Sequence, residues 1–136
     1  MQTYLKTIWR IFIVSVWINI SESLRWILFS KPHIDKHYNT LNLVLPNEPI
    51  NNIFWLIWGI IMAAMIFIIS KKFTLLQTTF IIWVTVFVMH WFALWNSAVF
   101  PAHILWLVIP LSFIDVLVGT LISMYFHKKE KILKQN

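Results

Sequence analysis

The feature that most constrains this chain is a set of four long apolar runs separated by short polar segments. A helix needs roughly 20 apolar residues to cross the hydrocarbon core of a bilayer. The sequence therefore predicts an all-α integral membrane protein, an antiparallel four-helix bundle that forms one domain over residues 1–136. The predicted spans are residues 11–29, 51–70, 73–96 and 102–126.

Composition excludes several other classes of protein. Of the 136 residues, 60% are hydrophobic and 12% are charged, whereas a soluble domain is nearer half apolar and a quarter charged. Outside the four runs too few residues remain for a separate soluble catalytic or nucleic-acid-binding domain. Despite the net charge of +6, we therefore expect no nucleic-acid partner. Because the chain has no cysteine, thiol catalysis and cysteine metal sites are excluded, and no cofactor is predicted.

The basic residues predict the orientation of the chain in the membrane. With four spans, both tails and the short connection at residues 71–72 lie on one side, and the connections 30–50 and 97–101 lie on the other. Eight of the ten lysines and arginines outside the runs fall on the first side, and only Lys31 and Lys36 fall on the second. Positive loops favour the cytoplasm, so we expect both termini to be cytoplasmic and the protein to reside in the inner (plasma) membrane. The eight are Lys6, Arg10, Lys71, Lys72, Lys128, Lys129, Lys131 and Lys134.

The longest connection, the outer loop at residues 30–50, is expected to be ordered in part. Pro32, Pro46 and Pro49 interrupt it, and prolines of this kind are typical of loops. Residues 40–45 alternate in polarity, which predicts a short extended segment. In the same loop His33, Asp35 and His37 form a weak metal-binding pattern, from which no metal site is predicted.

Four ionisable residues within the spans are the main functional signal: Glu22, Arg25, His90 and Asp115. A charge near the bilayer centre costs on the order of 3 kcal/mol or more, so such residues usually face protein or water and serve a function. Measured from the midpoint of each run, the four lie within about 10 Å of one another in depth. We therefore expect them to meet around one cavity in the outer half of the membrane.

Helical phase supports this convergence. Ser15, Asn19 and Glu22 recur at helical spacing as one polar stripe of the first span, and Arg25 follows Glu22 by three residues, which favours an ion pair. Asp115 has no basic residue three or four positions away, so packing by itself offers little reason for its burial. The residues predicted to bind a ligand or couple protons are Asn19, Glu22, Arg25, Trp55, Trp58, Trp83, His90, Asn96 and Asp115.

Structural explanations compete with this functional one. Glu22 and Arg25 form a pair that by itself can set helix register, and His90 is equally consistent with a hydrogen-bonded core histidine. Packing accounts for most of the nine tryptophans. The inner halves of the spans contain few polar residues below Asp115, so the polar path is expected to be closed on the cytoplasmic side. Those few are Ser70, Gln77, Thr78 and Ser123.

Three function classes follow, and the first is favoured. If Arg25 keeps Glu22 ionised, Asp115 is the acid free to take up and release a proton, and it then couples protons to a ligand held against tryptophan walls. Secondly, Asp115 and His90 suit an acid–base pair in a membrane enzyme acting on a lipid-like substrate. Thirdly, the chain is a non-catalytic subunit of a membrane complex. The expected partners are membrane lipid, a small-molecule or lipid-like ligand, and a second copy of the chain; whether the protein is an enzyme is left open.

Overall fold

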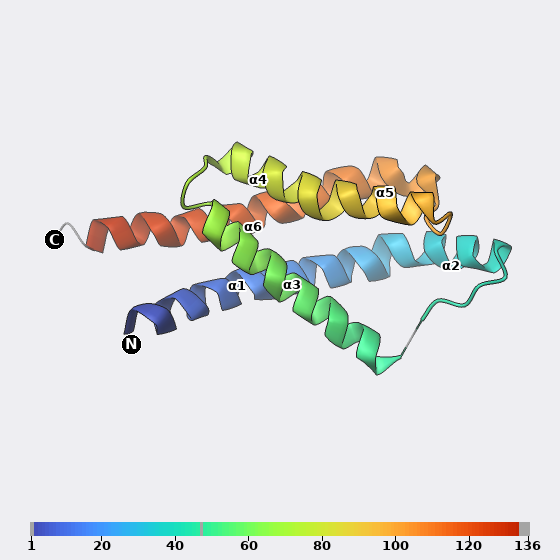
Figure 1. Cartoon of the computed structure of the whole chain (residues 1–136), viewed down its shortest axis with the longest axis horizontal. Helices are drawn as coiled ribbons and strands as arrows, with labels where there is room; N and C mark the ends of the chain where they lie inside the picture. The colour runs from blue at the N-terminus through green and yellow to red at the C-terminus, as the bar shows by residue number, and fades with distance from the viewer. Residues whose placement is uncertain (1, 47, 134–136) are drawn as a thin grey trace.

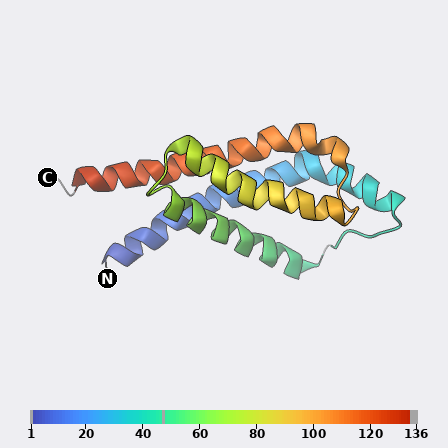
Figure 2. The ribbon, with the colours of Figure 1, turned by 45° about the horizontal axis from the view of Figure 1, so that its top comes forward.

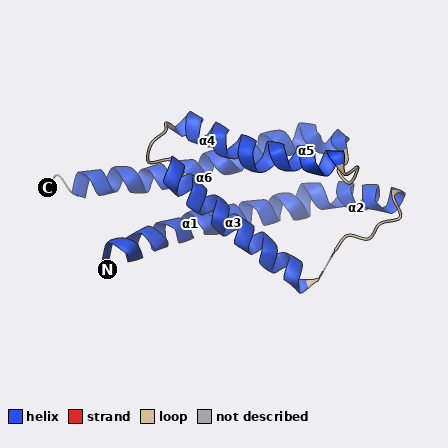
Figure 3. Ribbon diagram, in the orientation of Figure 1, coloured by secondary structure: helices blue, strands red, loops and turns tan. Residues whose placement is uncertain are grey.

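The regular elements of the described residues are all helices. The computed structural model describes residues 2–46 and 48–133, with side chains for residues 4–46 and 48–128. Within these ranges no strand is present (Figure 3). Four helical segments are long and apolar enough to cross a membrane, which confirms the predicted all-helical chain with four candidate spans. They are Tyr4–Thr40, Pro49–Ile69, Leu75–Asn96 and Ala102–Lys128. Of the basic tail, Lys134 lies outside the described residues, as do the side chains of Lys129 and Lys131.

The first span belongs to a helix much longer than predicted. α1 (Gln2–Arg25) continues through a π-helical turn, η1 (Trp26–Ser30), into α2 (Lys31–Thr40). At 1.5 Å per residue the segment Tyr4–Thr40 extends roughly 55 Å, so it exceeds the thickness of a hydrocarbon core by roughly 25 Å. The prediction of a loop from residue 30 is therefore wrong for residues 30–40. Pro32 does not stop the helix: it directly follows the π-helical turn η1, whose wider hydrogen bonding ends with the bond from the amide of Lys31 to the carbonyl of Trp26.

The extended segment predicted at residues 40–45 is also absent. Thr40 is the last residue of α2, and the chain then turns at Asn42, which has a φ of 55°. Asparagine adopts this left-handed conformation more readily than most residues. The amide of Leu43 donates to the carbonyl of Tyr38 at 3.0 Å, so the local hydrogen bonds close the helix end in place of a strand.

The other three spans are helices with local irregularities. Thr74 and Gln77 form a capping box at the start of α4, which satisfies amide groups that have no partner inside the helix. A second π-helical turn interrupts the third span, and Pro110 lies inside α6. In chain order the elements are α3 (Pro49–Ile69), α4 (Leu75–Trp83), η2 (Val84–Val88), α5 (Met89–Asn96), η3 (Ala102–Ile104) and α6 (Leu105–Leu133).

The helices pack into an elongated bundle with both chain ends at the same end of the molecule (Figures 1 and 2). α1 packs against both α3 and α6, and α4 packs against α6. Apolar side chains from all four spans fill the interior, among them Val14, Ile18, Met62, Ile66, Ile82 and Val116. Large apolar side chains also cover the outside, as expected where hydrocarbon replaces water; examples are Ile20, Ile57, Phe80, Phe92 and Leu121.

Candidate functional site

Three of the four predicted ionisable residues form one charged triad, which consists of Glu22, Arg25 and Asp115. Arg25 pairs through Nη2 with Oε2 of Glu22 on the same face of α1, and its Nε lies 3.5 Å from Oδ2 of Asp115 on α6. The side chains of Glu22, Arg25 and Asp115 are 15%, 14% and 12% exposed. One guanidinium thus joins two buried carboxyl groups from two helices.

The charged triad has hydrogen-bonding capacity that the described side chains do not use. Oε1 of Glu22, Nε of Arg25 and Oδ2 of Asp115 are buried and make no hydrogen bond within the described part of the chain. Most buried polar atoms in proteins have such a partner. The triad also has a surplus of one negative charge when both carboxyl groups are ionised, because a single guanidinium balances only one of them.

Further contacts hold the two helices of the triad together. Nε1 of Trp17, on α1, donates a hydrogen bond of 3.0 Å to the backbone carbonyl of Asp115. On α6, Ser112 accepts a 3.0 Å bond from Nε1 of Trp83, so α4 is tied to the same helix one turn before the acid. These bonds position Asp115 from two sides.

The guanidinium of Arg25 also lies over an aromatic ring. Its Cζ is 5.3 Å from the ring centroid of Phe87, a distance at which a cation is attracted to the ring face. Phe87 is buried and contacts Trp58 on α3 with 5.6 Å between centroids and Trp91 on α5 with 6.0 Å. Arg25 therefore connects the charged triad to aromatic residues of two other spans.

These rings extend into one aromatic cluster. Trp91 contacts Trp83 at 6.0 Å, Trp83 contacts Phe113 at 5.6 Å, and Trp58 contacts Trp55 at 5.6 Å. Three predicted tryptophans therefore lie in this tryptophan-rich cluster. Its members are Trp55, Trp58, Trp83, Phe87, Trp91 and Phe113.

Both π-helical turns border the triad. η1 begins directly after Arg25, and η2 contains Phe87. A π turn inserts an extra residue and so changes the direction in which neighbouring side chains face, and such turns occur often at functional sites. The residue pattern predicted an uninterrupted α-helix here, so the contact between Phe87 and Arg25 was not predicted. The available signal was that Phe87 lies one helical turn before the predicted site residue His90.

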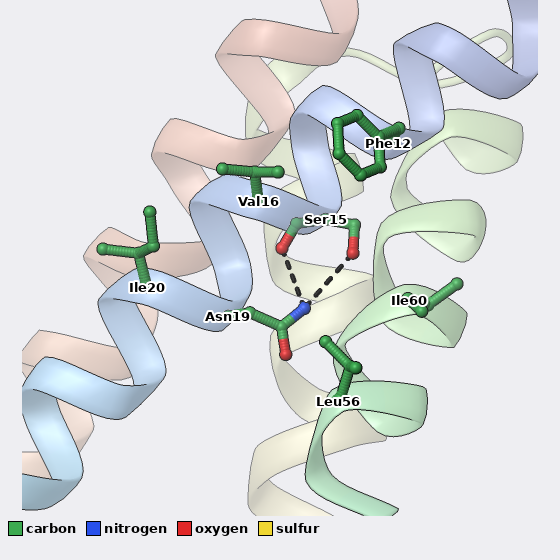
Figure 4. A pocket seen from close by; sticks show the side chains of 7 residues that line it. All are labelled: Phe12, Ser15, Val16, Asn19, Ile20, Leu56 and Ile60. Atoms are coloured by element: carbon green, nitrogen blue, oxygen red, sulfur yellow. Dashed lines mark hydrogen bonds between the residues drawn. The ribbon is translucent and has the colours of Figure 1, made fainter. Parts of the chain in front are cut away.

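Asn19 lies in a separate groove between α1 and α3. Its Nδ2 donates to the carbonyl and hydroxyl oxygens of Ser15 at 2.9 and 3.2 Å (Figure 4). The amide rests on Gly59, where an added Cβ would stand 2.5 Å from Nδ2. The groove has a volume of about 330 Å³, and apolar side chains form most of its walls: Phe12, Val16, Ile20, Leu56 and Ile60.

The remaining predicted site residues lie outside the charged triad. His90 is exposed on α5, and its ring contacts Trp55 at a centroid distance of 6.4 Å. Asn96 is the exposed last residue of α5. In the described part of the chain no hydrogen bond or ion pair joins either residue to the triad. The structure thus brings Glu22, Arg25 and Asp115 into contact and leaves His90 outside these contacts.

The histidines of α2 attach that helix to the segment before α6. Nδ1 of His33 lies 3.4 Å from Nε2 of His103, and Nε2 of His37 lies 3.2 Å from the carbonyl oxygen of Ala98. Asp35 pairs with Lys31 at 2.6 Å. Among the described residues no group of three or more His, Cys, Asp or Glu side chains could hold a metal ion. His33 and His37 therefore face different partners.

A second buried polar group was missed by the sequence analysis. We call Ser70, Ser123 and His127 the hydroxyl–histidine cluster: the two serine oxygens are 2.8 Å apart, and Nε2 of His127 lies 3.1 Å from Oγ of Ser70. Spacing on α6 was the available signal, because Ser123 and His127 continue the face that contains Asp115.

The two polar sites differ in chemistry. The charged triad combines acids, a fixed cation and aromatic rings, whereas the hydroxyl–histidine cluster contains neutral hydroxyls and one imidazole. Comparison with models of protein families, with curated proteins and with solved structures finds no match to this chain.

Proposed function

We propose that this chain is an antiparallel four-span protein of the plasma membrane, with cytoplasmic termini, that binds a small aromatic cation and exchanges it for a proton. The observation that supports this function is the position of Arg25 between the carboxyl groups of Glu22 and Asp115. One guanidinium balances one carboxylate, so the second needs a proton or another cation. A proton and a cationic ligand then compete for the same surplus charge.

The aromatic cluster supports a cationic, planar ligand. Aromatic faces attract cations, tryptophan most strongly. Phe87 already lies against the guanidinium of Arg25, and Trp58 and Trp91 surround Phe87. A ligand cation next to the carboxylates would therefore meet ring faces as well as negative charge.

Lysine and arginine positions support the orientation. Eight of the ten basic residues outside the predicted spans are on the side of the two tails, the distribution typical of cytoplasmic segments. Both chain ends lie at one end of the molecule (Figure 1). Arg25 then belongs to the outer half of the membrane, and Asp115 lies close to the membrane centre.

A lipid-like ligand, with or without catalysis, is the second candidate. The groove between α1 and α3 favours it, because most of its lining is apolar and Asn19 and Ser15 are its polar lining residues (Figure 4). An alkyl chain fits such walls, and a polar head fits the amide. Mass spectrometry of the purified protein tests this candidate: a retained lipid that is lost in an Ile60→Trp variant would favour it.

The leading proposal is tested with ethidium, a planar cation whose fluorescence reports binding. Purified wild-type protein in detergent is titrated with ethidium at pH values from 5 to 8.5. We expect the affinity to rise with pH, by up to tenfold per unit, because deprotonation creates the surplus charge that the cation balances. Release of about one proton per bound ethidium should appear in weakly buffered solution.

Asp115→Asn is the decisive variant, and Asp35→Asn is its control because Asp35 is a carboxylate of α2 paired with Lys31. We expect Asp115→Asn to weaken ethidium binding at least tenfold and to abolish its pH dependence, while Asp35→Asn behaves as wild type. Wild-type binding that does not change with pH, or normal binding by Asp115→Asn, would contradict the proposal. The function as a subunit of a membrane complex would then be preferred.

A further inference from the structure

One face of α6 connects the charged triad to the hydroxyl–histidine cluster. Polar or small residues recur on this face at spacings of three or four, in the order Ser112, Asp115, Gly119, Ser123 and His127. At 1.5 Å per residue, Asp115 and His127 are about 18 Å apart along the helix axis. The face therefore crosses much of the apolar interior between two polar sites.

His127 is the titratable member of the cluster and makes several polar contacts. Its Nε2 lies 3.1 Å from Oγ of Ser70, 3.4 Å from Oγ of Ser123 and 3.2 Å from the carbonyl oxygen of Phe67. The ammonium of Lys71 lies 4.5 Å from the ring centroid of Phe67, whose ring contacts that of His127 at a centroid distance of 4.7 Å; Lys128 is exposed. Imidazole is the side chain best suited to gain and lose protons at physiological pH.

Additional hydroxyl groups lie in the same half of the bundle. Thr78 and Thr79 are fully buried near the start of α4, and their Oγ1 atoms have no hydrogen-bond partner among the described residues. α4 packs against α6. Hydroxyl groups without a protein partner can bind water molecules. The half of the bundle around the hydroxyl–histidine cluster therefore has hydrogen-bonding groups beyond those of its few charged residues.

An apolar layer separates the two sites at Gly119. A Cβ built on Gly119 would stand 3.1 Å from Cδ1 of Ile18 and 3.4 Å from Cδ1 of Ile66. Both isoleucines are fully buried. α1 and α3 therefore close on α6 between Asp115 and Ser123, and each polar site is confined to its own side of this layer.

We propose that the hydroxyl–histidine cluster is a second proton-exchange site, which serves the membrane face at which the chain termini lie. This inference rests on the proposed function, because it supplies the exit for the proton that a cation displaces from the charged triad. That proton leaves a carboxyl group of the triad, passes by water and hydroxyl groups across the opened apolar layer, and binds the imidazole of His127 at the ring nitrogen that carries no hydrogen. The resulting imidazolium then releases it to water, so only O–H and N–H bonds change.

The test uses full-length protein reconstituted in liposomes of phosphatidylcholine and phosphatidylglycerol that contain the pH dye pyranine. Ethidium added outside should drive a proton flux in wild-type vesicles. We expect His127→Gln to slow this flux at least tenfold while its ethidium affinity in detergent stays within twofold of wild type. Lys128→Gln, the change of the neighbouring exposed residue, should leave both quantities unaltered.

Glutamine separates proton exchange from a structural role, because its amide can still donate to the carbonyl of Phe67. If His127→Gln restores the wild-type flux that His127→Ala loses, the histidine only holds α3 to α6 and the inference is wrong. Should His127→Gln fail to fold, Ser123→Ala is expected to slow the flux at least threefold, and a normal flux in that variant overturns the inference. Absence of ethidium-linked flux and proton release in wild-type protein would instead reject the proposed function.

Discussion

Arg25 is the residue on which the buried charges of this protein depend. It pairs with Glu22 on its own helix, approaches Asp115 on α6 and lies over the ring of Phe87. The cost of desolvating an ion is several kcal/mol, and a well-placed counter-ion offsets it. Arg25 thus stabilises the fold and, in the proposed function, leaves one carboxylate to be balanced by a proton or a ligand.

Replacing Arg25 with leucine should therefore leave two acids without a counter-ion. We expect Arg25→Leu to lower the free energy of unfolding by about 3 kcal/mol, and the double variant Arg25→Leu with Glu22→Leu to recover much of that loss. Chemical denaturation in detergent, followed by tryptophan fluorescence, measures both. A double variant no more stable than the single one would show that the pair does not contribute to stability.

Among the elements, α1 packs tightly against α3, and Gly59 makes this packing feasible. Asn19 occupies the space that a side chain at position 59 would need, while its own amide is held by Ser15. Small residues are common where membrane helices approach closely. Gly59 therefore leaves room for the amide of Asn19 between the two helices.

A methyl group at position 59 should disturb this crossing. We expect Gly59→Ala to destabilise the protein by about 1–3 kcal/mol through overpacking, as measured by thermal unfolding in detergent. Adding Asn19→Ala removes the opposing amide, so the double variant should regain at least half of the loss. Equal stability of Gly59→Ala and wild type would show that the two helices can move apart freely.

The π-helical turns are the elements that periodicity reasoning could not supply. Residues such as Trp26 and Val84 fit an α-helix as well as a π-helix, because a single inserted residue barely alters a pattern of apolar residues. Yet η1 directly follows Arg25, and η2 contains Phe87. The two turns therefore affect which side chains meet. Pro32 likewise led to the prediction of a loop where α2 begins. The π-helical turn directly before Pro32 could not be predicted from the sequence pattern.

At the scale of the whole molecule, the long helix through Thr40 extends the first span beyond the others. Contacts between His33 and His103 and between His37 and Ala98 hold this extension against the segment before α6. The extension carries Lys31 and Lys36, the two basic residues predicted on the outer side. Its orientation is therefore the most direct test of topology.

Single cysteines can report this topology without background, because the chain has none. We expect an impermeant maleimide to label Lys36→Cys in intact cells and to label Lys71→Cys only after the cells are permeabilised, since Lys71 belongs to the predicted cytoplasmic side. Both positions are exposed in the structure, so accessibility of the folded protein is not limiting. Labelling of Lys71→Cys in intact cells would reverse the orientation.

Local spacing in the sequence was enough to predict four candidate spans and the pairing of Glu22 with Arg25, because the first needs only apolar runs long enough to span a bilayer and the second needs charges one helical turn apart. The packing of the helices was needed to show that Asp115 and Phe87 lie next to Arg25, that Asn19 faces Gly59, and that His127 meets Ser70. These contacts join residues distant in the chain. Which helix faces meet depends on side-chain packing across the whole bundle, which no local pattern contains.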